Sequence, residues 1–216
     1  MKTAILLVGD YWHNAETILP LKDKLFASDE WNVIFTEDPQ ELLKTDSAPD
    51  LFISFKDPIE NDQIPTPIWC EEEWTRRFFE FADNGMGIIF AHAAVTDLEA
   101  DHPIVKNVIG ALFTGHPKQC PVTFEPICSH PVLDGVLSFT FPENDEHYMM
   151  TMLDSTDTVI IAETKSQNGV QPAVWVKQND KYRVCCLTPG HTTNNLICDE
   201  YVRVLKNAVQ WCCKCC

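Results

Sequence analysis

Two histidines each follow closely on an apolar run that is typical of a buried strand. His92 comes directly after residues 87–91, which read GIIFA, and His191 follows residues 182–187 after a short Thr-Pro-Gly turn. In open parallel sheets, ligands bind outside the carboxyl ends of the strands. An imidazole titrates near neutrality and can therefore accept or donate a proton there. We accordingly expect His92 and His191 to belong to a functional site.

The alternative interpretation of His92 is structural. A histidine at the end of a buried strand can hydrogen-bond a neighbouring backbone group and carry no chemistry. The alanines at positions 93 and 94 leave room either for a substrate or for the close start of a helix. Position along the chain leaves both interpretations open.

The first ninety residues alternate between strand and helix patterns. Short apolar runs typical of strands buried on both faces occupy residues 3–8, 31–36, 51–55 and 87–90. Segments with helical patterns separate them, at residues 15–26, 38–43 and 71–84. This alternation predicts an α/β fold with a parallel sheet that is covered by helices on both faces.

The chain changes character after residue 95. Prolines punctuate short apolar pieces between residues 102 and 131, which implies extended segments joined by turns. The elements expected after this proline-rich excursion are a strand at residues 158–163, a hairpin of residues 173–177 and 182–187, and a final helix at residues 199–211.

Composition limits the functions that the chain can have. With 216 residues, 45% of them hydrophobic, we expect one substantial core and a single domain over residues 1–216. Sixteen basic and 32 acidic residues give a formal net charge of −16. Nucleic-acid binding needs clustered Lys and Arg, which the sequence lacks, and an acidic surface is repelled by an anionic membrane. Neither nucleic acid nor membrane is an expected partner.

Targeting and cysteine patterns favour the cytoplasm. The N-terminal apolar run, residues 4–8, is too short for a signal-peptide core, and no run reaches membrane-spanning length. Six of the ten cysteines are scattered through core and loop patterns, so we expect reduced thiols. The other four crowd residues 212–216, where they could bind a soft metal or accept a lipid, but a helix terminus without chemistry is expected. No nucleotide-binding motif is present.

Seven motifs, in order along nearly the whole chain, resemble the ThuA-like (trehalose-utilisation) family. They are His13 after the first strand, GIIFAHAA at residues 87–94, GALFTGHP at 110–117, His-Pro at 130–131 with Gly135 and Phe139 beyond, Asp-Glu-x-Tyr at 145–148, Pro-x-x-Trp at 172–175, and Gly-His at 190–191 before the final helix. One turn departs from the family, because NDKYR at residues 179–183 replaces the usual Gly-Lys-Gly-Arg.

The resemblance implies a fold similar to the class I glutamine amidotransferases, a flavodoxin-like three-layer sandwich with a mostly parallel central sheet. The proline-rich excursion and the late hairpin would be additions to it. Those enzymes place a nucleophilic cysteine at a strand-to-helix elbow and a histidine after a later strand. Here the elbow position is His92 and the later histidine is His191. Since position 92 is neither Ser nor Cys, we do not expect a covalent acyl intermediate or a cysteine-dependent amidotransferase.

The first functional hypothesis is acid–base chemistry on a disaccharide or keto-sugar derivative, the substrate class that the resemblance implies. His92 and His191 would be the catalytic pair of a sugar isomerase, hydrolase or lyase. Glu146 would hold one imidazole and Tyr148 would donate to an oxygen. Asp145 suits this role less, because neighbours in an extended segment point opposite ways. The residues expected to bind substrate are His13, Trp12, His116 and Trp175, the two tryptophans offering a face to a sugar ring.

The second hypothesis is a divalent metal, with zinc as first choice, serving a hydrolase or an isomerase. Neutral imidazoles and one carboxylate suit an open catalytic zinc site with water in the fourth position. The sequence contains no short His-x-x-x-His spacing, so the ligands would have to converge from separate loops. They would come from His13, His92, His116, His191 and Glu146.

The third hypothesis is a non-catalytic sugar-binding or interaction module, because this superfold hosts many functions. The expected partner is in every case a small sugar or sugar derivative. The oligomeric state stays open, with a homo-oligomer as one alternative. The remaining histidines, His102, His130 and His147, are expected to have structural roles.

Overall fold

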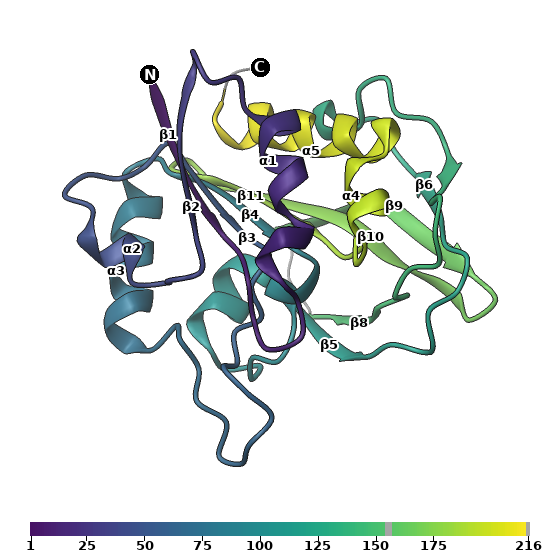
Figure 1. The fold of residues 1–216 in the computed structure, drawn as a ribbon, viewed down its shortest axis with the longest axis horizontal. Helices are drawn as coiled ribbons and strands as arrows, with labels where there is room; N and C mark the ends of the chain where they lie inside the picture. The colour runs from purple at the N-terminus through teal and green to yellow at the C-terminus, as the bar shows by residue number, and fades with distance from the viewer. Residues whose placement is uncertain (154–156, 215–216) are drawn as a thin grey trace.

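The computed structural model describes residues 1–153 and 157–214 and contains a nine-stranded mixed sheet (Figure 1). The strand order is β2-β1-β3-β4-β11-β10-β9-β6-β7. The first five strands in this order are mutually parallel, namely β2 (Trp31–Thr36), β1 (Lys2–Leu7), β3 (Leu51–Ser54), β4 (Gly87–Ala91) and β11 (Arg183–Leu187). Their carboxyl ends therefore meet at one edge of the sheet.

The other four strands pair in antiparallel fashion. They are β10 (Gly169–Gln178), β9 (Thr158–Ser166), β6 (Thr123–Pro126) and β7 (Phe139–Thr140). β10 and β11 form the predicted hairpin, in which Gln178 lies opposite Arg183. The register between β10 and β9 shifts between Pro172 and Val174, where proline lacks the N–H that a regular ladder needs.

The central parallel strands are buried along their whole length because both faces of the sheet are covered. Successive side chains of a strand point to opposite faces. Ile53 and Ile89 accordingly enter the core on one face, whereas Phe52 and Ile88 enter the core on the other. Such continuous apolar strands are what a parallel sheet with two covered faces requires.

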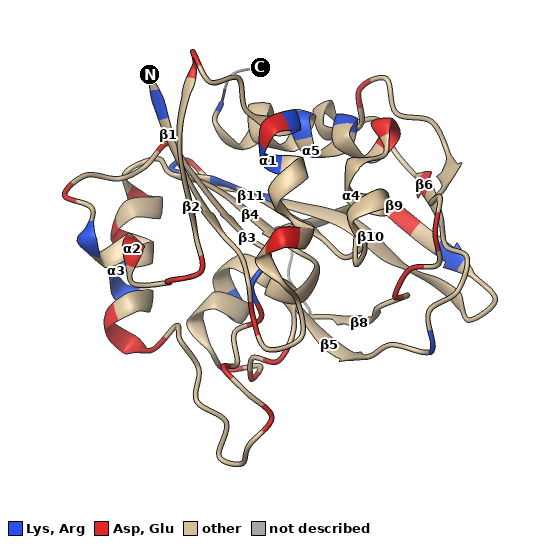
Figure 2. Ribbon diagram, in the orientation of Figure 1, with Lys and Arg blue, Asp and Glu red and all other residues tan. Residues whose placement is uncertain are grey.

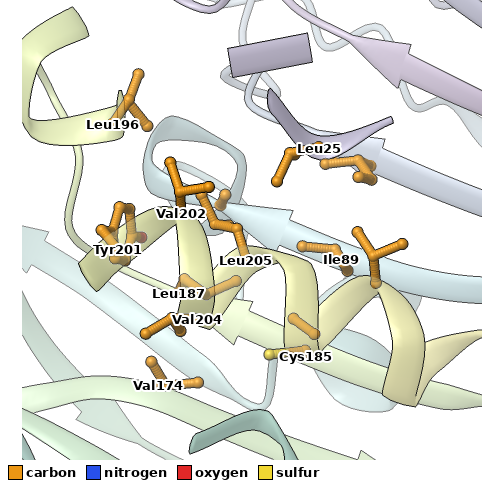
Figure 3. Packing of buried hydrophobic residues seen from close by; sticks show 14 of the residues in the cluster. Leu25, Ile89, Val174, Cys185, Leu187, Leu196, Tyr201, Val202, Val204 and Leu205 are labelled. Atoms are coloured by element: carbon orange, nitrogen blue, oxygen red, sulfur yellow. The ribbon is translucent and has the colours of Figure 1, made fainter. Parts of the chain in front are cut away.

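One helical layer consists of α1 (Leu19–Leu25), α4 (Thr193–Ile197) and α5 (Asp199–Cys212). Their apolar side chains pack against one face of the sheet. Figure 3 shows Val204 and Leu205 of α5 gathered with Ile89 and Val174 of the sheet. This layer carries no candidate site residue and serves as one half of the core.

The opposite face is covered by α2 (Glu41–Lys44), α3 (Glu72–Asp83) and a separate antiparallel pair, β5 (Ala111–Gly115) with β8 (Met149–Met152). Trp74 and Phe78 of α3 contact Phe52 of β3, with ring centroids 5.7 and 5.5 Å apart. The predicted α/β fold with both sheet faces covered is therefore confirmed.

The first helix differs from the helix predicted over residues 15–26. A 3-10 turn, η1 (Ala15–Thr17), comes first, capped by the Asn14 side chain, and α1 begins only at Leu19. Proline has no N–H, so a helix accommodates it in the first turn, where no hydrogen bond is lost. Pro20 therefore fixes where the regular helix starts.

The proline-rich excursion contains the expected extended segments and also two helical turns, η3 (Val105–Ile109) and η4 (Pro131–Leu133). The final helix, α5, ends at Cys212. The prediction for the cysteine-rich tail falls partly on residues 215 and 216, which lie outside the described residues.

Acidic side chains are spread over the loops and helices of the molecule (Figure 2). Among the residues that the structure describes, no helix combines the length and the apolar character that crossing a membrane would take.

Candidate active site

Three histidines lie together at the carboxyl edge of the parallel strands. His13 is in the loop after β1, His92 opens the 3-10 turn η2 (His92–Val95) directly after β4, and His191 follows β11. The ring centroids are 5.1 Å apart for His13 and His92, 5.3 Å for His13 and His191, and 5.4 Å for His92 and His191. The structure thus brings together imidazoles from three strand ends, as the alternation of elements predicts.

His92 occupies a strained backbone position and is almost fully buried. Its φ of 50° is left-handed, a conformation rare for residues other than glycine and frequent at functional sites. Nδ1 lies 2.9 Å from the Thr188 carbonyl oxygen and donates a hydrogen bond to it, so in the neutral ring the lone pair is on Nε2. Nε2 lies 3.3 Å from His191 Nδ1. The structural interpretation of His92 therefore accounts for Nδ1, and Nε2 faces the other residues of the cluster.

Glu146 connects the two strand-end histidines. Its Oε2 lies 3.2 Å from His191 Nδ1 and 3.5 Å from His92 Nε2. Hydrogen bonding to Glu146 raises the pKa of His191 above its ordinary value. Burial alone would raise the pKa of Glu146, but its interactions with the two rings, led by the hydrogen bond from His191, outweigh burial and hold that pKa well below the ordinary range. The contact between His191 and Glu146 therefore favours the imidazolium–carboxylate form of the pair.

Asp145 binds the backbone of the His191 loop. Its carboxylate accepts hydrogen bonds of 2.9 Å from the backbone N–H groups of both Gly190 and His191. Gly190 has a φ of 111°, and a Cβ there would lie 2.7 Å from Leu196, so only glycine fits. Asp145 and Glu146 therefore use different sides of one extended segment, as predicted. The positioning role of Asp145 is one that the sequence did not reveal.

Tyr148 stacks against His92. The ring centroids are 4.6 Å apart with an interplanar angle of 24°, and the hydroxyl lies 3.2 Å from His92 Nε2. Burial raises the pKa of Tyr148 well above its ordinary value, so the phenol keeps its proton. It can therefore donate a hydrogen bond at the point where the His92 lone pair is directed.

Asp10 is a site residue that sequence reasoning missed. Its buried carboxylate lies 2.9 Å from His13 Nδ1 and also accepts from the backbone N–H groups of Trp12 and Asp57. Burial would raise the pKa of Asp10, but the hydrogen bond with His13 and the other donors lower it overall. The signal was present, since an aspartate three residues before a histidine in a loop after a strand can orient its ring.

Four ligand atoms converge at this point. One atom each from His13, His92, Glu146 and His191 lies within 4.8 Å of the other three, which makes these residues a group able to hold a metal ion. His116, also predicted as a metal ligand, lies outside this group of converging atoms. Its Nε2 is 3.7 Å from Glu146 Oε1, and its Nδ1 lies 2.9 Å from the carbonyl oxygen of Pro117.

A cavity of about 270 Å³ opens beside these groups, and we call it the histidine cavity. Trp12 and His116 line it, in the place expected of substrate-binding residues. Trp175 does not, and its predicted substrate-binding role is wrong. It is fully buried on β10, and its indole N–H donates to the Ile109 carbonyl oxygen at 2.6 Å. The alternation of side chains along β10 turns this ring into the core.

Two further carboxyl groups, Asp57 and Asp97, line the histidine cavity and were not predicted. Asp57 is buried and accepts a hydrogen bond of 2.8 Å from Thr96 Oγ1. Burial, with a contribution from Asp97, raises the pKa of Asp57 to about 7. Asp97 has a left-handed φ of 50°. Neither residue belongs to a recognisable motif, and only the folded chain brings them together.

The other histidines contact backbone or side-chain groups away from the cavity. His102 Nε2 lies 3.3 Å from the Cys70 carbonyl oxygen, and His130 Nδ1 accepts from the Val132 N–H at the start of η4. His147 is buried between the Thr164 carbonyl oxygen and the Ser166 hydroxyl. These contacts agree with the structural roles expected for all three.

Comparison with known families identifies the family of the chain. The family model described as ThuA, trehalose utilisation, matches residues 5–212. The chain belongs to the ThuA family. Among curated protein sequences, none matches the chain.

Solved structures of ThuA-like proteins share the fold. A ThuA-like protein from Bacteroides uniformis ATCC 8492 is 22% identical, with a TM-score of 0.77 over 98% of this chain and 90% of the other. One from Parabacteroides merdae ATCC 43184 is 17% identical, with a TM-score of 0.75 over the same shares, 98% and 90%. A cytoplasmic protein of Salmonella typhimurium LT2 is 10% identical, with a TM-score of 0.64 over 98% and 99%. At these identities the likeness establishes the fold.

The predicted flavodoxin-like, class I glutamine amidotransferase-like fold is thereby confirmed for this member of the ThuA family. The strained position after β4, where the amidotransferases carry their nucleophile, is His92. An imidazole at this elbow suits proton transfer or metal binding.

Proposed function

We propose that this chain is an enzyme that performs acid–base chemistry on a disaccharide or keto-sugar derivative. The observation that carries the proposal is the His92–Glu146–His191 cluster. One imidazole in it keeps a lone pair on Nε2, and the other is held as an imidazolium by a carboxylate. His92 Nε2 lies 3.3 Å from His191 Nδ1, and His191 lines the histidine cavity. The family's description, trehalose utilisation, supports a sugar as the substrate.

The proposed reaction is an elimination on a keto-sugar. His92 Nε2 takes the proton from the carbon next to the carbonyl, and the electron pair of that C–H bond forms a C=C bond. The C–O bond to the leaving group breaks at the next carbon. The leaving oxygen takes a proton from His191 Nε2, because the proton on Nδ1 is held by Glu146. His92 gains one proton and His191 loses one, so Glu146, which contacts both rings, stabilises the imidazolium before and after the step.

Other residues of the cavity would orient the sugar. The phenol of Tyr148 stays protonated and can donate to the carbonyl oxygen as negative charge develops on it. Trp12 offers an exposed ring, and His13 and His116 offer polar groups for the hydroxyls. These assignments follow from which side chains line the cavity.

The pair of histidines is tested by replacing each one. His92→Ala and His191→Ala should each lower kcat by about 10²–10⁴-fold, the usual contribution of a positioned acid or base. His92→Ala should also lower the free energy of unfolding by about 1–3 kcal/mol, because the Thr188 carbonyl oxygen loses its donor, so turnover is compared per folded molecule. His102→Ala removes an imidazole outside the cavity and is the matched control, with expected full activity. Wild-type turnover of a keto-disaccharide by both variants would contradict the proposal.

A second candidate function is metal-dependent chemistry at the same site. The favouring observation is that Nδ1 of His92 and Nδ1 of His13 are occupied by Thr188 and Asp10, as the outer nitrogens of metal-bound histidines commonly are. With Glu146 and His191, the donor set of imidazoles and one carboxylate fits zinc. A bound zinc would polarise a carbonyl oxygen or activate water.

Metal analysis of protein purified without an affinity tag separates the two candidates. The metal hypothesis predicts about one equivalent of zinc and a lower unfolding temperature after chelation. Asp10→Asn should then weaken zinc binding by about 10–100-fold, the effect of losing an outer partner. Less than about a tenth of an equivalent of zinc, with unchanged thermal stability after chelation, would rule the metal out.

We also propose that the protein works in the cytoplasm on a small-molecule partner. Support comes from its structural likeness to a Salmonella typhimurium protein described as cytoplasmic and from cysteines scattered through the chain. Cell fractionation checks the location, and recovery of the protein in the membrane or secreted fraction would contradict it.

A further inference from the structure

A second pocket lies beside the histidine cavity, where β1, β2 and β3 end at their carboxyl edge. We call it the outer pocket, lined by Tyr11, Glu37, Asp38, Lys56, Glu60 and Trp69 among others. We propose that the outer pocket binds the second ring of a disaccharide whose reacting ring occupies the histidine cavity. This assignment rests on the proposed function, because it takes the histidine cavity as the place of reaction.

The two pockets share a wall built by neighbouring residues. Tyr11 lines the outer pocket and Trp12 lines the histidine cavity, and their rings meet edge to face with centroids 4.9 Å apart. Lys56 and Asp57 repeat this division, with Lys56 in the outer pocket and Asp57 in the histidine cavity. Adjacent residues of the chain therefore line both pockets, and one ligand can contact both.

The aromatic rings of Tyr11 and Trp12, which separate the two pockets, are exposed to solvent. Tyr11 is 59% exposed and Trp12 is 46% exposed, although both residues are large and apolar enough to be favoured in a core. Aromatic rings supply a large, rigid apolar face together with a polar edge, which suits the apolar faces and hydroxyl rims of sugar rings. The two rings thus offer one contact surface to each half of a two-ring ligand.

The volumes also favour a divided ligand. The histidine cavity holds about 270 Å³ and the outer pocket about 390 Å³. Pockets that bury a whole drug-sized ligand hold roughly 300–1,000 Å³. The volume of the histidine cavity lies just below this range, so the cavity suits one sugar ring. The second ring of a disaccharide must then lie outside it. The outer pocket is the adjoining space large enough to receive that ring.

The charges of the outer pocket select a neutral, hydroxyl-rich group. Glu37, Asp38 and Glu60 place three carboxylates around Lys56, so an anionic ligand such as a phosphate would be repelled. Carboxylate oxygens accept hydrogen bonds from sugar hydroxyls, and the lysine ammonium donates to them. The same chemistry disfavours a purely apolar ligand, because the polar groups would lose their water.

The wall between the pockets is held in a defined shape. Gly9 has a φ of 73°, and a Cβ there would lie 2.6 Å from Glu37 Oε2, so the loop approaches Glu37 as closely as glycine permits. The Lys56 ammonium donates to the Gly9 carbonyl oxygen. Asp10, in the same loop, accepts from the backbone N–H of Asp57 at 2.9 Å. The outer pocket is therefore formed before any ligand arrives.

Calorimetric titration with two sugars tests the outer pocket. Trehalose is the two-ring probe and methyl α-D-glucoside is the one-ring probe. The wild type should bind trehalose about tenfold more tightly, and Tyr11→Ala should remove most of this difference while binding of the glucoside stays within about twofold. Tyr11→Phe keeps the ring face and is the matched control that retains the preference. Trp12→Ala should weaken binding of both sugars.

Three outcomes would overturn the proposal. They are equal affinity of the wild type for the two sugars, an equal loss of affinity for both in Tyr11→Ala, and no binding of either sugar. Because the titration measures binding without turnover, its result does not depend on whether the proposed reaction is correct. Full turnover by His92→Ala would remove the proposed chemistry and leave the two-ring preference intact.

Discussion

The parallel half of the sheet and the proline-rich excursion build the same site in different ways. β1, β4 and β11 place His13, His92 and His191 at one edge, through strands whose register is fixed by two buried faces. The excursion supplies Glu146 and Tyr148 from a segment held by hydrogen bonds of Asp145 to Cys120 and to the His191 loop. The imidazoles thus depend on the whole core, whereas the carboxylate and the phenol depend on a few local contacts.

This difference implies that stability and activity can be changed separately. A substitution in the parallel core should lower the free energy of unfolding and leave the chemistry of each folded molecule intact. A substitution at the local contacts of the excursion should lower activity more than stability. The predictions below test this contrast, beginning with the largest expected effect.

Ile89→Ala should lower the free energy of unfolding by about 2–5 kcal/mol, the usual cost of this truncation in a core. Ile89 is completely buried between the sheet and α5 (Figure 3). Chemical denaturation measures the change. Activity per folded molecule should match that of the wild type. A loss of activity in the folded protein would show that the parallel core cannot be destabilised without affecting the chemistry.

Asp145→Asn should lower the free energy of unfolding by about 1–3 kcal/mol, because an amide cannot accept all the backbone hydrogen bonds that the buried carboxylate accepts. Turnover should fall by about tenfold to a hundredfold as the His191 loop loses its position. Asp29→Asn, at an exposed position after α1, is the control. Wild-type turnover with the expected loss of stability would contradict a positioning role.

The contrast between the regions also explains how far the sequence could predict them. Continuous apolar runs in the sequence indicate the parallel strands. The strand predicted at residues 31–36, for example, is β2 of the structure. The placement of His92 and His191 followed from the rule that parallel strands end at one edge. No such rule governs the excursion, where the partners of Glu146 depend on contacts between distant segments. The same holds for the grouping of Asp57, which follows β3, with Asp97.

Trp175→Phe should lower the free energy of unfolding by about 1 kcal/mol, since the Ile109 carbonyl oxygen would lose its donor. Sugar binding should not change, because Trp175 lies in the core and not in the cavity. Trp12→Ala is the matched variant, with the opposite expectation of weaker sugar binding at unchanged stability. Weaker sugar binding in Trp175→Phe would restore the role that the sequence predicted for it.

The stability contributed by the His191–Glu146 pair should depend on pH. The pKa of His191 is raised, so its contribution is fully present below the ordinary value of 6.5 and is lost as the pH rises through the folded pKa. The pKa of Glu146 is lowered, so its contribution is present above 4.5 and is lost as the pH falls through the folded pKa. The stability difference between wild type and Glu146→Gln should therefore be largest between pH 4.5 and 6.5. Urea denaturation checks this, and a difference that stays constant with pH would contradict it.

The errors of sequence reasoning have physical causes. Trp175 follows an aromatic motif, but the face of β10 on which it lies is set by pairing with β9 and β11. His116 lines the cavity without joining the four converging ligand atoms. By contrast, the sequence was sufficient to predict Asp10 as a partner of His13, because the two residues are three positions apart in one loop.

Exchange of deuterium from solvent tests the central claim most directly, because it separates the base from the acid. A keto-disaccharide is incubated in D₂O with each variant, and label at the carbon next to the carbonyl is followed by NMR together with release of the leaving group. Removal of that proton by His92 predicts no label with His92→Ala. Protonation of the leaving oxygen by His191 predicts continued labelling but no release with His191→Ala. Labelling at the wild-type rate by His92→Ala would contradict the account.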